Sequence, residues 1–238
     1  FYRHNMDTVN QFGNVAREAG VKSYRKTGAT AIMVEEDPKL FEELKRYYRV
    51  ENELRGKHGL PGIRVVYGTP ARRIANNHPN YGVVLFGEDE VGMVDPVELL
   101  DKLAAHSGAQ IYEGTKATKL RNTRTGVVVE TENGEVVANR AIMATQGVDL
   151  DGRLRPHLER SYAHMISTDQ LTTEQIAQLG TWTKGPAWTT MDDASGTAYA
   201  YMRLNGNKLY FGGELEPDVD VTDVDYSALY DSMTSLFP

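Results

Sequence analysis

The clearest local signal of the fold lies in residues 127–145, which read VVVETENGEVVANRAIMAT. Two runs rich in valine flank Asn133-Gly134, the dipeptide that tight hairpin turns prefer. The sequence therefore predicts a β-hairpin over residues 126–141 that turns at this dipeptide. The near-continuous apolar run over 141–145 predicts a further strand, buried on both faces.

Outside this stretch, helical and extended patterns alternate without a regular βαβ rhythm. Helices are predicted where apolar residues recur at helical spacing, at 5–19, 37 to about 56–59, 70–75, 95–108, 172–179 and 225–237. In the helix that Asp95-Pro96 begins, Val97 and Leu100 are expected to point inward. Strands are predicted at 24–34, 63–67, 81–86, 110–112, 116–120, 162–168, 187–191, 198–204 and 208–211. This mixture predicts an α+β fold with a large mixed, mostly antiparallel sheet and flanking helices.

Composition narrows the class of protein. The 238 residues, 40% hydrophobic and 25% charged, are ordinary for a globular protein with a sizeable core. A net charge of -7 argues against a nucleic-acid partner, because phosphates require clustered cations. The absence of cysteine excludes disulfides and thiolate chemistry and fits a reducing compartment, so a cytoplasmic location is expected. No apolar run is long enough for a membrane span.

Motifs for several kinds of chemistry are missing from the sequence. No two of the six histidines lie three to five residues apart, so no metal site is expected. There is no Gly-x-Ser-x-Gly elbow of a hydrolase. There is also no Gly-x-Gly-x-x-Gly, and Gly212-Gly213 is too short to hold a phosphate. Composition and sequence pattern therefore predict an α+β domain but do not indicate its activity.

Several segments in order carry a resemblance to a known family. They are GMVDP at 92–96 with the helix after it, residues 108–120, the hairpin with AIMATQG at 141–147, YAYMR at 199–203 and KLYFGG at 208–213. Together they resemble the FAD-dependent oxidoreductases related to D-amino-acid oxidase, sarcosine oxidase and glycine oxidase. The likeness covers most of residues 10–215. The family's Gly-rich segments at both ends are missing, so the chain is expected to be an internal piece that holds FAD poorly by itself.

The resemblance implies a division of the chain and a set of cofactor contacts. Residues 1–90 would be the part of the substrate domain with the N-terminal helices, 91–150 partial elements of an FAD-binding α/β domain, and 151–238 the substrate-domain sheet with the C-terminal helix. The backbone of Ala117 would meet the adenine edge of FAD. The small residues Ala144, Thr145 and Gly147 would let the chain approach the cofactor closely.

Tyr199, Tyr201 and Arg203 alternate on one predicted strand and would therefore point to one face. Two phenols and a guanidinium suit the carboxylate of an amine substrate. The alternative is an ordinary sheet face on which Arg203 pairs with Glu214 or Glu216. Trp188 nearby is expected to pack rather than to contact substrate.

The resemblance implies that the whole protein oxidises the C–N bond of an amine or amino acid by hydride transfer to FAD. No catalytic side chain is predicted, because the flavin carries the chemistry. Two alternatives stay open. One is a non-catalytic binding or scaffold domain that lost its cofactor, and the other is a flavin dehydrogenase of a hydroxy substrate.

Overall fold

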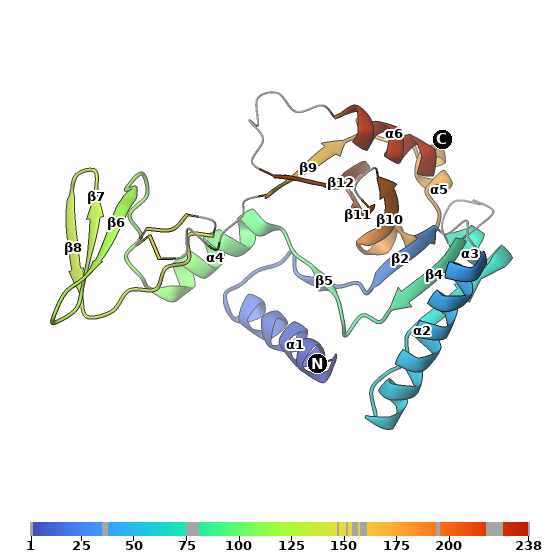
Figure 1. Cartoon of the computed structure of the whole chain (residues 1–238), viewed down its shortest axis with the longest axis horizontal. Coiled ribbons are helices and arrows are strands. Elements are labelled where there is room, and N and C mark those ends of the chain that lie inside the picture. The colour runs from blue at the N-terminus through green and yellow to red at the C-terminus, as the bar shows by residue number, and fades with distance from the viewer. Residues whose placement is uncertain are drawn as a thin grey trace.

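The computed structural model describes residues 2–34, 38–74, 81–146, 148–150, 152–153, 157, 161–193, 196–217 and 226–237. Within these ranges the strands form sheets of seven, three and two strands. Figure 1 shows the three-stranded sheet at one end of the molecule, the seven-stranded sheet toward the other, and α4 (Pro96–Ser107) between them. The expected α+β class is confirmed.

The seven-stranded sheet is mixed and mostly antiparallel, as the sequence predicts. Its order is β3 (Arg64–Tyr67), β4 (Tyr81–Phe86), β2 (Ala29–Val34), β10 (Ala187–Asp193), β11 (Gly196–Asn205), β12 (Lys208–Pro217) and β9 (Ser161–Ser167). Only the pair β2 and β10 runs parallel among the described ladders of this sheet. Both hydrophobic core clusters are built on this sheet.

The predicted strand over 24–34 is divided in two at Gly28. Gly28 has a φ of +63°, and a Cβ there would lie 2.3 Å from the carbonyl oxygen of Phe86. Only glycine accepts this left-handed conformation at such a close approach. The residues before it form β1 (Arg25–Lys26), which leaves the large sheet and pairs with β5 (Gly92–Met93).

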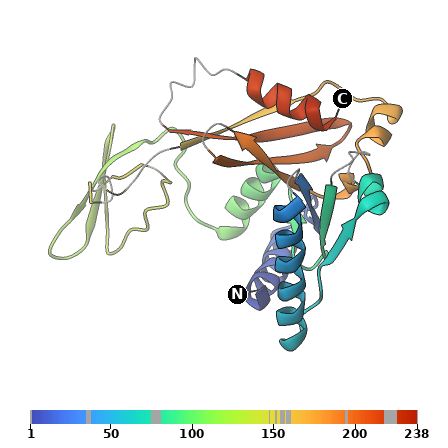
Figure 2. The same cartoon turned by 45° about the vertical axis from the view of Figure 1, so that its right-hand side comes forward.

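Helices cover one face of the large sheet along most of its width. This face packs against α3 (Gly68–Ile74), α5 (Thr173–Gln178), the 3-10 turn η2 (Trp182–Lys184) and α6 (Ser227–Leu236). Figure 2 shows α6, in red, lying along the sheet. Its core includes Phe211, Met202 and Leu229, all almost fully buried. Burying each such side chain contributes about 1.5–3 kcal/mol.

The opposite face is covered at one end by α2 (Pro38–Lys57). Leu44 and Tyr48 of this helix pack on a second cluster built from Ala31, Ile63 and Val84. This cluster spans β2, β3 and β4, with Trp188 at its border. Toward β11 and β12 the same face is more open, since Tyr201 is 39% and Met165 is 50% exposed.

Two further helices are connected by hydrogen bonds: the second helix binds the backbone of the segment that follows the first. α1 (Tyr2–Glu18) packs on Tyr24, whose hydroxyl donates to the carbonyl oxygen of Val9 at 3.0 Å. α4 (Pro96–Ser107) is capped by Asp95, whose carboxylate accepts from two backbone N–H groups. The Glu98 carboxylate of α4 accepts the N–H groups of Lys22 and Ser23 at 2.9 and 2.8 Å.

The tie between Glu98 and residues 22–23 gives a testable dependence on pH. Hydrogen bonds from the Ser23 side chain and from the backbone of Lys22 and Ser23 hold the pKa of Glu98 below its ordinary value. A carboxyl with a lowered folded pKa stabilises the fold above its unfolded pKa, and this contribution is lost as pH falls through the folded pKa. Denaturant unfolding across that acidic range should show a steeper loss of stability in the wild type than in Glu98→Gln. Parallel curves for the two proteins would contradict this expectation.

The predicted hairpin is confirmed, with its turn one residue earlier than expected. β7 (Val127–Thr131) pairs with β8 (Gly134–Ala138), and β6 (Ala117–Asn122) pairs with the other side of β7. Because Thr131 lies opposite Gly134, the turn residues are Glu132 and Asn133. Gly134 begins the second strand with a φ of +154°.

Three expectations for this part of the chain are wrong. Val97 and Leu100 of α4 do not point inward but are 68% and 66% exposed. Residues 141–145 do not form a buried strand, and Ile142 is 94% exposed. Residues 110–112 are likewise not extended in a sheet. A strand requires a neighbour to satisfy its backbone groups, and in the described part of the chain no strand pairs with 141–145.

Candidate functional site

The open face of β11 and β12 carries the predicted substrate residues. Tyr201 lies opposite Gly212 and Arg203 opposite Tyr210 in the antiparallel ladder. Since side chains alternate along a strand, and Met202 faces the helix-covered core, Tyr201 and Arg203 belong to the opposite face. Tyr199 is paired through its backbone with Thr190, but its side chain is outside the described part. The expected strand and its pairing with 208–211 are confirmed.

Tyr201 is placed by a glycine on the neighbouring strand. A Cβ at Gly212 would lie 2.4 Å from Cε2 and 2.7 Å from Cζ of the Tyr201 ring. It would also lie 2.9 Å from the carbonyl oxygen of His164 on β9. The ring therefore lies across β12 in space that only glycine leaves open. The sequence analysis did not identify this role, although Gly212 in KLYFGG could have been found from the register of the two strands.

Gly212→Ala should lower the free energy of unfolding by about 1–3 kcal/mol, because overpacking forces the Tyr201 ring or the β12 backbone to move. Urea unfolding measures the change. Gly56→Ala is the matched control, since a Cβ at this helical position meets nothing within 4 Å. It should not destabilise the protein. Equal stability of Gly212→Ala and the wild type would show that the ring is not held at this position.

Arg203 is oriented by an aromatic neighbour. Its guanidinium carbon lies 5.5 Å from the centroid of the Tyr210 ring, within the range of cation–π attraction. A guanidinium in such a contact still has N–H donors for an acceptor such as a carboxylate. The alternative partners Glu214 and Glu216 have side chains outside the described residues. Tyr210 was not identified by the sequence analysis.

Trp188 has the packing surroundings that the sequence analysis expected. It lies opposite Tyr201 on β10, and its ring is 5.2 Å from that of Phe86. It also borders the cluster beneath α2. Trp188 thus separates the part of the face covered by α2 from the part that carries Tyr201.

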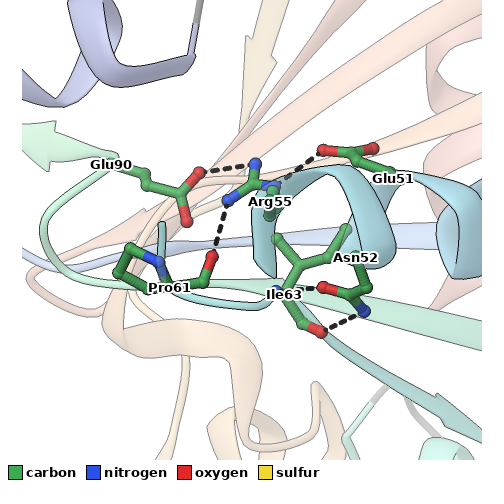
Figure 3. A network of polar contacts seen from close by, with 6 residues as sticks. All are labelled: Glu51, Asn52, Arg55, Pro61, Ile63 and Glu90. Carbon is green, nitrogen blue, oxygen red and sulfur yellow. Dashed lines mark hydrogen bonds and ion pairs between the residues drawn. The ribbon is translucent and has the colours of Figure 1, made fainter. Parts of the chain in front are cut away.

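A buried network of charges fixes the loops at the end of α2 (Figure 3). Arg55, 1% exposed, donates from Nε to Glu51 at 3.0 Å and forms an ion pair with Glu90 at 2.8 Å. It also donates to the carbonyl oxygen of Pro61 at 3.3 Å. Burial disfavours its charge, but the hydrogen bonds and charges of Glu90 and Glu51 outweigh this effect, and the pKa of Arg55 is raised above its ordinary value.

This network connects α2 with the residues that follow it and with a turn that is distant in the sequence. Asn52, one helical turn away, binds both the N–H and the carbonyl oxygen of Ile63 through its amide, at 2.8 and 2.9 Å. Glu90 belongs to the turn between β4 and β5. The network therefore holds the β4–β5 connection against α2. The spacing of Glu51 and Arg55 suits a helical ion pair, but no local signal in the sequence points to Glu90.

The expected cofactor residues fit FAD in part. Ala117 begins β6, an edge strand whose ladder to β7 is irregular between Ala117 and Lys119, and so it presents backbone groups at an edge. Ala144 is exposed, and the Thr145 hydroxyl donates to the carbonyl oxygen of Val148 at 2.5 Å. Gly147 lies outside the described residues. An edge strand at Ala117 and a small exposed residue at Ala144 would suit a close approach of the cofactor, whereas the sequence has no Gly-x-Gly-x-x-Gly for the pyrophosphate.

The segment after Thr145 lies beside the edge of β6. The N–H of Leu120 donates to the carbonyl oxygen of Leu150 at 3.0 Å. This contact brings the end of the 141–150 segment to the strand that Ala117 begins. The structure thus brings two of the sequence-predicted cofactor segments to one side of the three-stranded sheet. This sheet lies away from β11 (Figure 1).

The described ranges contain neither a metal-binding cluster nor a helix that could span a membrane. No group of three or more histidine, aspartate or glutamate side chains there is arranged to hold a metal ion. Among the helices of the same ranges, none combines the length and the apolar character needed to cross a bilayer.

Comparison with known proteins identifies the family. The family described as "DAO: FAD dependent oxidoreductase" matches residues 1–238. The "Probable oxidoreductase OrdL" of Rhizobium meliloti (strain 1021) is 27% identical over 172 residues, which are 71% of this chain and 39% of that protein.

Solved structures share the fold at low sequence identity. Glycine oxidase from Geobacillus kaustophilus matches with a TM-score of 0.66 and 17% identity, over 99% of this chain and 61% of that one. L-proline dehydrogenase from P. horikoshii matches with a TM-score of 0.67 and 17% identity, over 98% and 60%. The chain thus spans about three fifths of these two structures and two fifths of OrdL. From the match over its whole length, the chain belongs to the DAO family of FAD-dependent oxidoreductases.

Proposed function

We propose that the whole protein oxidises the C–N bond of an amine that bears a carboxylate, such as an amino acid. The observation that carries this proposal is the open face of β11 and β12, where Arg203 and Tyr201 lie together in a chain of a flavoenzyme family. Relatives of the same fold include a glycine oxidase and an L-proline dehydrogenase by name. A guanidinium within cation–π distance of the Tyr210 ring suits the carboxylate that these substrates share.

The side chains of this face bind and orient the substrate. Arg203 donates its in-plane N–H groups to the carboxylate, and the Tyr201 hydroxyl donates a further hydrogen bond that fixes its orientation. Bound FAD supplies the acceptor for the hydride that leaves the carbon bearing the nitrogen. The resulting imine is hydrolysed by water to a carbonyl compound and an amine or ammonia. No nucleophilic side chain is needed for this reaction.

Residues 91–150 are proposed to be part of the domain that binds FAD, with the backbone of Ala117 at the adenine edge and with Ala144, Thr145 and Gly147 as residues that let the chain approach the cofactor closely. Exposed apolar side chains on α4, β8 and the following segment support this division of the chain; they include Val97, Leu100, Val137 and Ile142. Such a set of exposed apolar residues marks a surface that packs against further protein. Residues 1–90 and 151–238 then form the substrate-binding part around the large sheet.

The purified 238-residue chain is expected to hold FAD weakly. Without a Gly-rich loop at a helix N-terminus, the pyrophosphate has no cradle of N–H groups to offset its charge. Gel filtration after incubation with FAD should return a protein peak without visible flavin absorption. A yellow protein with stoichiometric flavin would contradict this expectation and would place the whole cofactor site within these residues.

Steady-state turnover tests the proposed reaction. The protein, expressed at full length with FAD, is offered an amino acid, the hydroxy acid with the same carbon skeleton, and the amine that lacks the carboxylate. We expect turnover of the amino acid with release of ammonia, and a much higher KM for the amine without the carboxylate. Turnover of the hydroxy acid alone would overturn C–N oxidation. An absence of bound flavin would favour the non-catalytic alternative.

A further inference from the structure

A cavity of about 430 Å³ lies where β4 ends and β2 begins. Its walls come from β2, β3, β4, α3 and the η2 turn, so five separate elements meet around it. The volume falls in the range of small-molecule sites, which is roughly 300–1,000 Å³. Thr30 and Leu85 are paired across β2 and β4 and line the cavity, on the face that carries Ile32 in the core beneath the helices. The cavity is therefore on the opposite face from Tyr201.

The charged side chains around this cavity are all cationic. Arg64 comes from β3, Arg73 from α3 and Lys184 from η2, and no acidic residue is among the residues that line it. In the part of the chain that the structure describes, none of the three forms an ion pair with a carboxylate. Three like charges gathered on a protein of net charge -7 create a local positive potential.

The rest of the lining is apolar or neutral. Leu85 and Trp182 contribute apolar surface, and Thr27, Thr30 and Thr181 are neutral residues of the lining. The Trp182 ring is fixed because its Nε1 donates to the carbonyl oxygen of Leu179 at 2.6 Å. Gly185 closes the wall at a point where a Cβ would lie 2.6 Å from the carbonyl oxygen of Gly28. The cavity thus combines a rigid apolar wall with cations from three elements.

We propose that this cavity binds a small organic anion that bears two or more carboxylate or phosphate groups. The two guanidinium groups offer planar pairs of N–H donors that match a carboxylate or a phosphate, and Lys184 adds a further point charge. The threonine hydroxyls complete the hydrogen bonding. The carbon skeleton of the anion lies against the apolar wall. This site lies on the opposite face of the sheet from Tyr201. The proposal of an anion site can therefore be correct or wrong independently of the proposed reaction.

Isothermal titration calorimetry on the full-length protein tests the proposal. Citrate represents the polycarboxylates and inorganic phosphate the phosphate groups, each titrated at constant ionic strength set with sodium chloride. We expect saturable binding of at least one of them. Arg64→Gln, Arg73→Gln and Lys184→Gln should each weaken it about tenfold, the typical loss when a charge-assisted hydrogen bond is removed. Arg46→Gln, an equal change of charge on the exposed side of α2, should bind like the wild type.

The possible results distinguish a carboxylate site, a phosphate site and the absence of an anion site. Binding of citrate alone assigns the site to carboxylates, and binding of phosphate alone assigns it to phosphates. Thermal melting without added anion checks that each variant folds, and only folded variants are compared. Equal affinity in the wild type and in a variant that combines Arg64→Gln, Arg73→Gln and Lys184→Gln would overturn the proposal. An absence of saturable heats for both anions would overturn it as well.

Discussion

Arg55→Ala is expected to lower the free energy of unfolding by about 3–5 kcal/mol, the usual cost of removing one partner from a buried ion pair. The Arg55 side chain is 1% exposed and lies between the carboxylates of Glu51 and Glu90, both nearly buried. Without the guanidinium, two like charges remain close together in a region of low dielectric. The carbonyl oxygen of Pro61 also loses a donor. Urea unfolding of the purified protein measures the loss.

Two matched variants show whether this cost comes from the network. Arg46→Ala removes an exposed arginine from the same helix and should change stability by no more than about 0.5 kcal/mol. Combining Arg55→Met with Glu51→Gln and Glu90→Gln removes the unpaired charges together and should recover a large part of the loss. A loss below about 1 kcal/mol in Arg55→Ala would show that the network is solvated and does not hold the β4–β5 turn.

Arg203→Ala should raise KM for a carboxylate-bearing amine about ten- to a hundredfold, the range that corresponds to the loss of a charge-assisted pair. This expectation rests on the proposed function and is measured by steady-state kinetics on the full-length, FAD-loaded protein. Tyr201→Phe should have a smaller effect if its hydroxyl only orients the substrate. The matched control is again Arg46→Ala, which should leave KM unchanged.

The substrate itself provides the second control for Arg203. An amine without a carboxylate cannot use the guanidinium, so its KM should be nearly the same in the wild type and in Arg203→Ala. If KM rises equally for both substrates, Arg203 supports the fold of the sheet rather than the substrate. An unchanged KM for the amino acid would show that its carboxylate is bound elsewhere.

The sequence predicts the fold well where the signals are local. The β-hairpin, the capped helix from Asp95-Pro96 and the antiparallel strands around residues 199–211 are all present. Each depends on turn chemistry, capping or alternation within a few residues. The prediction fails at 141–145, because an apolar run becomes a strand only when neighbouring strands satisfy its backbone. It also fails for Val97 and Leu100, whose spacing indicates an apolar helix face but not what covers it.

The candidate site is only partly predictable for the same reason. Alternation along one strand places Tyr201 and Arg203 on one face, and the structure agrees. The partners that position them, Gly212 and Tyr210, lie across the ladder, so they become visible only once the register is known. The link from Arg55 to Glu90 is of this kind too, since it joins two segments that are 35 positions apart in the sequence. Contacts between distant segments depend on the packed fold rather than on local pattern.

Anaerobic reduction of the flavin tests the central claim most directly. The full-length protein with bound FAD is mixed, without oxygen, with an amino acid or with the hydroxy acid of the same carbon skeleton. If the open face of β11 and β12 serves the oxidation of a carboxylate-bearing amine, the amino acid bleaches the visible absorption of the flavin and the hydroxy acid does not. Arg203→Ala should then require much higher amino-acid concentrations for the same bleaching. Bleaching by the hydroxy acid alone, or equal concentration dependence in Arg203→Ala and the wild type, would contradict the account.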